Sequence, residues 1–245
     1  MTTIHRRARL NRLVAGLALC VALPLVALVG RVRPVRGRNL ALRAVRLVAR
    51  LVGVTFEVRL PSGGRPAPPN VYVPNHSSPV DIPALLTACP DIRFLAAADL
   101  FRVPLLASAM RALRTIPIDR RNSEVAHRQL DAVIAGPDHT SDLAIFAEGG
   151  IAPAGQRLPF KTGAFAVAIQ TGTPIVPVAV HGSARVLPPR SFLALRPGTV
   201  VVELLEPVTT VGLSLDDRGA LRDRVESLVC TALARGPRNA VTVSD

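Results

Sequence analysis

Apolar residues occur along most of the chain in two spacings. Short, mostly apolar segments have the length and β-branched content of buried strands; they cover residues 54–60, 71–73, 92–96, 143–146, 174–180 and 199–205. Between them, longer segments repeat apolar residues every three or four positions, as on one face of a helix; they cover residues 82–88, 100–113, 123–134, 161–172 and 215–235. Strand and helix therefore alternate, which is typical of an α/β domain.

The N-terminal segment departs from this pattern. Leu13–Gly30 is an almost continuous apolar run that is interrupted by Pro24 and by no charged residue. Its length is close to the minimum for crossing a bilayer, but arginines flank it on both sides, so charge predicts no orientation. This favours a helix that dips into one leaflet or lies in the interface. A secretory signal peptide is the alternative interpretation.

The segment that follows, Asn39–Val54, has helical spacing. Its apolar residues share one face, and a stripe of arginines lies beside them; the two sets are Leu40, Ala44, Leu47, Val48 and Leu51, and Arg43, Arg46 and Arg50. This pattern fits a helix on an anionic membrane surface, or a core-facing helix with a solvated arginine face. We expect residues 1–54 to form membrane-anchoring helices and residues 55–238 to form the α/β domain.

Composition narrows the class of partner. The 245 residues carry a formal net charge of +13, and 49% of them are hydrophobic, with a mean hydropathy of +0.35. The charge favours an anionic partner, and the hydropathy favours a membrane-associated protein. Seven Phe, one Tyr and no Trp supply few stacking platforms, so we expect no nucleic acid partner. Three isolated cysteines predict neither a disulfide framework nor a metal site.

The strongest candidate for chemistry is the stretch from Asn75 to Asp81, which joins a predicted strand to a predicted helix. Ser78 is placed to cap a helix that starts near Pro79, and Asp81 completes a capping box. Asp81 could also face back to His76 and hold one ring nitrogen, which would leave the other nitrogen free to take a proton from a hydroxyl. Taken alone, His76 could equally be a structural histidine at a strand end.

Three further positions could bind an anion or shape a site. Arg120 ends a short β-branched segment, where its planar fork could hold a phosphate, or it could lie in a solvated loop. Glu148 and Gly149 follow a buried strand, and the glycine allows close approach of a ligand, although an exposed glycine-rich loop is the simpler reading. Lys161 is the only lysine and stands near a predicted helix N-terminus.

In order along the chain, four sequence blocks resemble those of the lysophosphatidic acid acyltransferase family, the 1-acylglycerol-3-phosphate acyltransferases. The blocks are N-H-x-S-x-x-D at 75–81, I-P-I-D-R at 116–120, F-x-E-G at 146–149 and V-P-V-A at 176–179. Two positions differ from the family pattern: Arg114 and Ile151 stand where the family usually has glycine and arginine. Arg114, Arg157 or Lys161 could supply the missing positive charge.

The resemblance implies an α/β fold in which a mixed, largely parallel sheet has helices on both faces. It implies an acyltransferase domain in which His76 is the general base and Asp81 orients its imidazole. Arg120, Glu148 and Gly149 would shape the site for a phosphate-bearing acceptor. It implies no cofactor and no metal, because the acyl donor, acyl-CoA or acyl carrier protein, is itself a substrate.

The expected function is transfer of a fatty acyl group from a thioester to a lysophospholipid hydroxyl in phospholipid biosynthesis, with 1-acylglycerol 3-phosphate giving phosphatidic acid. We expect the protein at the cell membrane, on an anionic lipid surface, with its catalytic domain on the cytoplasmic side. Two alternatives remain: a basic lipid-binding protein that keeps the fold without catalysis, and a thioesterase that uses water in place of the alcohol.

Overall fold

The computed structural model of the chain describes residues 34–119, 123–136, 141–153, 155–189 and 195–237. Strands and helices alternate in it, as the sequence predicts. The strands are β1 (Val54–Arg59), β2 (Val71–Pro74), β3 (Arg93–Ala97), β4 (Ile116–Ile118), β5 (Leu143–Ala144), β6 (Ile175–His181) and β7 (Gly198–Leu204). The α-helices are α2 (Pro34–Val52), α3 (Asp81–Ala88), α4 (Pro104–Ala112), α5 (Ser123–Ala135), α6 (Gly163–Thr171), α7 (Ser183–Val186) and α8 (Arg218–Arg235), and the short 3-10 helices are η1 (Ala98–Arg102) and η3 (Leu215–Asp217).

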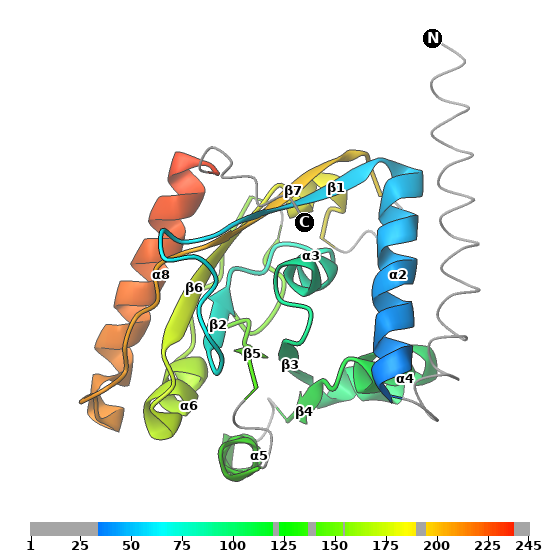
Figure 1. Cartoon of the computed structure of the whole chain (residues 1–245). Coiled ribbons are helices and arrows are strands. Elements are labelled where there is room, and N and C mark those ends of the chain that lie inside the picture. The colour runs from blue at the N-terminus through cyan, green and yellow to red at the C-terminus, as the bar shows by residue number, and fades with distance from the viewer. Residues whose placement is uncertain (1–33, 120–122, 137–140, 154, 190–194, 238–245) are drawn as a thin grey trace.

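The strands form one 7-stranded sheet in the order β1-β7-β6-β2-β5-β3-β4 (Figure 1). Strands β6, β2, β5, β3 and β4 run parallel to one another, whereas β7 pairs antiparallel with β6 and parallel with β1. The sheet is therefore mixed and largely parallel. Because β2 lies between β5 and β6, the carboxyl ends of these three strands meet at one edge, where open α/β sheets place their sites.

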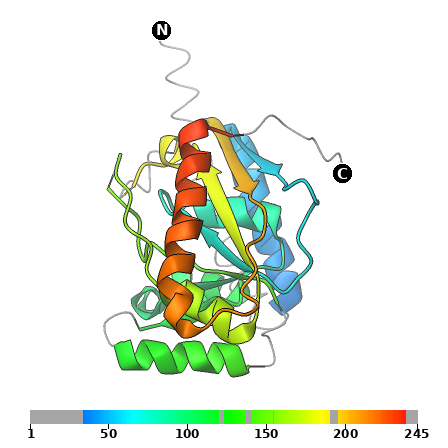
Figure 2. The same ribbon diagram turned by 90° about the vertical axis from the view of Figure 1, so that its left-hand side faces the viewer.

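Helices cover both faces of the sheet, and alternate residues of each central strand point to opposite cores. On one face α2, α3 and α7 pack on Tyr72 and Val178, and on the other α5, α6 and α8 surround Val73 and Ile175. Figure 1 shows α8, α6 and α5 on one side and α2, α3 and α4 on the other, and in Figure 2 α8 crosses in front of the sheet. The expected fold class is confirmed.

Helix α2 begins before the segment that the sequence predicts and joins the domain core. Ala49 and Val52 are buried among core residues, while Leu47 and Leu51 remain 55% and 38% exposed. Arg43, Arg46 and Arg50 are exposed as well. The apolar face is thus divided between the core and the surface. The helix packs on the core, as the core-facing interpretation predicts, and it also keeps exposed leucines beside its arginines, as the membrane-surface interpretation predicts.

The apolar run Leu13–Gly30 lies outside the described residues, and the division of the chain at residue 54 stays a prediction. Within the described part of the chain, no helix has both the length and the hydrophobicity needed to span a bilayer.

Local rules explain where the elements differ from their predicted bounds. The helix expected over 100–113 is divided into η1 and α4 because Val103 is extended before Pro104, as residues preceding proline usually are. The C-terminal helical segment starts at Leu215 as expected, but its first turn is the 3-10 helix η3, which Ser214 and Asp217 cap with a capping box, and α8 itself begins at Arg218. Arg114 adopts a positive φ of 54°, a conformation that glycine accepts more readily. The family's usual glycine at this position therefore has a backbone reason.

Gly182 connects β6 to α7 at the edge that holds the candidate site. Its φ is +81°, and a Cβ added there would lie 2.5 Å from the Thr199 carbonyl oxygen. Gly172 has a similar φ of +63°, but a Cβ there would meet no atom within 4 Å. Alanine at either position is strained by its backbone, and at Gly182 it must also displace β7.

We expect Gly172→Ala to lower the free energy of unfolding by about 1–2 kcal/mol, the usual cost of a left-handed residue. Gly182→Ala should cost a further ~1–3 kcal/mol, because overpacking adds to the strain. Urea denaturation followed by circular dichroism measures both losses. Equal losses in the two variants would show that the sheet yields to the added methyl group at no cost.

Candidate functional site

The candidate site forms where the chain leaves β2. His76 follows the buried strand, and its Nδ1 lies 2.9 Å from Oδ2 of Asp81, the first residue of α3. The same Oδ2 accepts hydrogen bonds from the backbone N–H groups of Ser77 and Ser78 at 2.8 and 2.9 Å. A carboxylate oxygen only accepts, so the Nδ1 atom of His76 carries the proton in this pair.

Asp81 is fully buried, whereas the side chain of His76 is 13% exposed. The second carboxylate oxygen of Asp81, Oδ1, is also buried and has no hydrogen-bond partner among the described residues. With Nδ1 donating to Asp81, Nε2 of His76 is the nitrogen left with a lone pair. Within the described part of the chain, no hydrogen bond engages Nε2. The arrangement can accept a proton at Nε2 and stabilise the resulting imidazolium.

The turn before α3 combines the two predicted roles of Asp81. The helix begins at Asp81, two residues later than predicted, and its preceding residue Val80 makes no side-chain cap bond. One of the two bonds of a capping box is nevertheless present, since the Ser78 N–H donates to Asp81; the Oγ of Ser78 accepts from the Val80 N–H and not from that of Asp81, which donates to the Ser78 carbonyl. The Oγ of Ser78 also donates to the Leu187 carbonyl at 2.7 Å, which fixes the turn to the segment after α7.

Glu148 holds His76 from the turn that follows the neighbouring strand β5. One carboxylate oxygen accepts the His76 N–H at 2.8 Å, and the other accepts the Leu158 N–H at 3.0 Å. Glu148 is only 3% exposed, so it does not lie in an exposed loop. Burial raises the pKa of its carboxyl above the ordinary value, although the two N–H donors and His76 oppose that rise.

Phe146, two residues before Glu148, supports the imidazole itself. The two rings stack with their centroids 3.9 Å apart and an interplanar angle of 24°. Phe146 is itself buried among core residues beneath α3. The ring of His76 is therefore fixed by a hydrogen bond at one edge and by an aromatic surface on one face.

Strand β6 holds the same loop from the other side. The side-chain amide of Asn75 accepts the Val180 N–H at 2.7 Å and donates to the Val180 carbonyl at 3.2 Å. Ser77 Oγ and Ser183 Oγ lie 3.0 Å apart. Sequence reasoning did not assign these contacts. Asn75 belongs to the first sequence block, but nothing in the pattern around Ser183 points to it, because the topology alone brings it beside Ser77.

Two further predicted site residues, Gly149 and Lys161, lie against each other. Lys161 lies against Gly149: a Cβ added to Gly149, whose φ is +74°, would be 3.0 Å from both Cε and Nζ of Lys161. The exposed Lys161 precedes α6, and its N–H donates to the Ala147 carbonyl at 2.9 Å. His76, Asp81, Glu148, Gly149 and Lys161 are thus gathered at one edge of the sheet.

Arg120 lies outside the described residues, so its predicted role stays a prediction. The described residues contain no group of three or more His, Cys, Asp and Glu side chains that could hold a metal ion.

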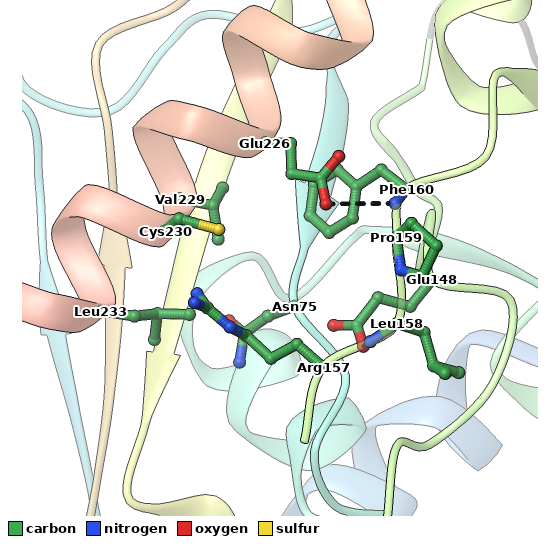
Figure 3. Close-up of a pocket in the computed structure, with 10 residues that line it drawn as sticks. All are labelled: Asn75, Glu148, Arg157, Leu158, Pro159, Phe160, Glu226, Val229, Cys230 and Leu233. Atoms are coloured by element: carbon green, nitrogen blue, oxygen red, sulfur yellow. Dashed lines mark hydrogen bonds between the residues drawn. The ribbon is translucent and has the colours of Figure 1, made fainter. Parts of the chain in front are cut away.

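Beside Asn75 and Glu148 a cavity of about 310 Å³ opens toward α8 (Figure 3).

Because burial raises the pKa of Glu148, the stability of the folded protein should depend on pH through this side chain. The variant Glu148→Gln has no titrating group at this position and should lack that dependence. The folded state keeps the proton to higher pH than the unfolded state, so the contribution of Glu148 to stability is complete below its unfolded pKa and falls as the pH rises through the folded pKa. We expect the difference in Tm, wild type minus Glu148→Gln, to decrease from about pH 4 to about pH 8. Thermal melts across this range measure it, and a difference that grows with pH would contradict the assignment.

Comparisons with known proteins identify the family of the chain. A family model described as Acyltransferase matches residues 48–181, more than half of the 245 residues. The mouse 1-acyl-sn-glycerol-3-phosphate acyltransferase alpha is 33% identical over 205 residues, which are 80% of this chain and 72% of the mouse protein. The 1-acyl-sn-glycerol-3-phosphate acyltransferase of Salmonella typhimurium is 30% identical over 163 residues, 66% of this chain and 65% of that protein.

Other relatives are longer. The chain spans 42% of the chloroplastic 1-acyl-sn-glycerol-3-phosphate acyltransferase of Brassica napus, to which it is 31% identical over 153 residues, 61% of its own length. Among solved structures, the 1-acyl-sn-glycerophosphate acyltransferase PlsC of Thermotoga maritima shares the fold, with a TM-score of 0.74, 23% identity and coverage of 96% of this chain and 98% of that chain. The resemblance carried by the four sequence blocks is confirmed: the chain belongs to the 1-acyl-sn-glycerol-3-phosphate acyltransferases, a family of O-acyltransferases.

Proposed function

We propose that this protein transfers a fatty acyl group from an acyl thioester, acyl-CoA or acyl carrier protein, to the hydroxyl of a lysophospholipid. The acceptor is 1-acylglycerol 3-phosphate and the product is phosphatidic acid. One observation carries the proposal: Nδ1 of His76 is bound to a buried carboxylate, and Nε2 is left without a partner among the described residues. The names of the relatives support the choice of acceptor.

In the proposed reaction Nε2 of His76 accepts the proton of the acceptor hydroxyl as its oxygen attacks the thioester carbonyl carbon. The tetrahedral intermediate then collapses, the carbon–sulfur bond breaks, and the imidazolium returns the proton to the leaving thiolate. Asp81 stabilises the imidazolium between these steps and keeps Nδ1 as the donor. No acyl-enzyme intermediate is needed, because the hydroxyl attacks the donor directly.

The other site residues would position the substrates. Glu148 holds the backbone of His76, and the absence of a side chain at Gly149 leaves room for the Lys161 ammonium beside the same turn. A compact ammonium at this place suits a phosphate oxygen. We assign Lys161 and Gly149 to the acceptor phosphate and retain Arg120 in the same role as a prediction.

Replacing the base tests the proposal. His76→Ala in the purified full-length protein should lower transfer from a labelled acyl thioester by ~10²–10⁴-fold, the usual contribution of general-base catalysis. Asp81→Asn should also lower the rate, since it removes the charge that stabilises the imidazolium. The rate is measured as labelled phosphatidic acid formed from 1-acylglycerol 3-phosphate.

Asp216→Asn is the matched control, because Asp216 is an exposed carboxylate away from the site; its rate should equal that of the wild type. Retention of more than a few per cent of the wild-type rate in a folded His76→Ala protein would refute the role of His76. Free fatty acid released without acceptor would indicate a thioesterase. Vesicle binding without any thioester consumption would indicate the non-catalytic lipid-binding protein.

We further propose that α2 contacts an anionic membrane surface. Arg43, Arg46 and Arg50 are exposed along this helix, and Leu47 and Leu51 expose apolar surface next to them. Arginines near an anionic surface and apolar side chains that enter the interface are the two contributions that hold interfacial helices. This surface would keep the domain beside its lipid substrate at the cell membrane, on the cytoplasmic side.

Replacing Arg43, Arg46 and Arg50 together by Gln should weaken binding to anionic vesicles by tenfold or more, since each arginine contributes ~1 kcal/mol near such a surface. Cosedimentation with anionic and zwitterionic vesicles measures the change, and only the anionic vesicles should show it. Arg222→Gln with Arg224→Gln on α8 is the control. Deletions that test the segment before α2 should end at residue 33, because removing Ala49 and Val52 would open the core.

A further inference from the structure

A cavity lies beside the loop that carries the candidate base, and two segments form its walls. Helix α8 contributes one side, and the segment from Arg157 to Phe160 contributes the other; Asn75 and Glu148 form the part nearest His76 (Figure 3). Its volume of about 310 Å³ is at the lower end of the range for small-ligand sites. The residues from α8 are Glu226, Val229, Cys230 and Leu233. The cavity therefore lies on the α8 face of the sheet, opposite α3.

Most polar groups of this cavity are already engaged. The amide of Asn75 is bound to Val180 through both its atoms, and the two oxygens of Glu148 accept from His76 and Leu158. One oxygen of Glu226 accepts a long bond, 3.4 Å, from the Phe160 N–H. These groups maintain the shape of the cavity and have little capacity left for a ligand.

Arg157 is different. Its guanidinium extends across the cavity toward α8 in Figure 3, between Asn75 and Leu233. Its side chain is exposed, and among the described residues it makes no hydrogen bond and no ion pair. A planar fork of N–H donors that lines a cavity and has no protein partner in the described part of the chain matches the oxygens of a phosphate or a carboxylate.

We propose that this cavity binds a phosphate-bearing part of a substrate and that Arg157 is the residue that selects it; the inference rests on the proposed acyl transfer. Leu158, next to Arg157, donates to the same carboxylate that holds His76. A phosphate on Arg157 therefore lies beside the loop that carries the base. Both substrates bring phosphate, the lysolipid in its headgroup and the donor in its coenzyme A or its phosphopantetheine arm, and the test below distinguishes these two sources.

Glu226 opposes this binding, so replacing it should change the affinity in the opposite direction from replacing Arg157. Its carboxylate lines the same cavity, so its negative charge repels a bound phosphate. Removing the charge with Glu226→Gln should tighten binding, whereas removing the cation with Arg157→Gln should weaken it. A role of either residue in folding alone would not produce effects of opposite sign on one Michaelis constant.

The experiment measures steady-state acyl transfer by the full-length protein while one substrate is varied at saturation of the other. We expect Arg157→Gln to raise KM for one substrate by about tenfold or more, as charged hydrogen bonds imply, with kcat within about twofold of the wild type. Glu226→Gln should lower the same KM. The control Arg224→Gln, an exposed arginine of α8 outside the cavity, should leave both constants unchanged.

The substrate whose KM responds identifies the source of the phosphate. Calorimetric titration with 1-acylglycerol 3-phosphate, coenzyme A and inorganic phosphate gives a second readout that needs no turnover. Arg157-dependent binding in a wild-type protein without transfer activity would support the cavity and refute the proposed function. Unchanged KM values in both variants of an active enzyme would overturn the cavity proposal, as would Arg157-dependent binding of inorganic phosphate alone.

Discussion

The site depends on one buried oxygen atom, Oδ2 of Asp81. Three donors converge on it: the N–H groups of Ser77 and Ser78 and Nδ1 of His76. Burying a carboxylate is costly unless its charge is hydrogen-bonded, and these donors make the burial tolerable. The same bonds order the turn before α3 and orient the imidazole, so the start of the helix and the direction of the base are set by one interaction.

Sheet order explains why this loop is held so firmly. Strand β2 lies between β5 and β6, so the residue after it can be bound from both sides. Glu148, which follows β5, accepts the His76 N–H, and Val180 of β6 is bound by Asn75. Strands of one parallel sheet shift little relative to one another because their ladders and two cores are continuous. The base is therefore positioned by backbone contacts as well as by its own side chain.

Local patterns were enough to predict most of the elements and the pairing of His76 with Asp81, because both depend on residues close in sequence. The stacking of Phe146 on His76 and the contact of Ser77 with Ser183 were not predicted, because they arise from strand order. Leu47 shows the same limit in α2: helical spacing gives a face, but only the domain decides which part of that face is covered.

Arg114 illustrates how a departure from a family pattern can be read physically. Its positive φ means that the turn before β4 keeps the backbone conformation that a glycine would favour, even though an arginine occupies it. The chain thus retains the turn at some conformational cost. The other departure, Ile151, has no comparable backbone reason; it removes a cation from the turn after Glu148, in a segment where Arg157 and Lys161 also lie.

Glu148 connects the position of the base with the position of the cavity wall. It bonds the loop that carries the base and the segment that carries Arg157, one oxygen to each. Movement of either segment changes the geometry of a buried carboxylate that has no other hydrogen-bond partner in the described part of the chain, and a buried acceptor left unsatisfied is costly. The position of the base and the position of the cavity wall are therefore energetically linked. An anion bound at Arg157 would stabilise the arrangement in which His76 is already correctly placed, so that substrate selection and proton transfer use one set of contacts.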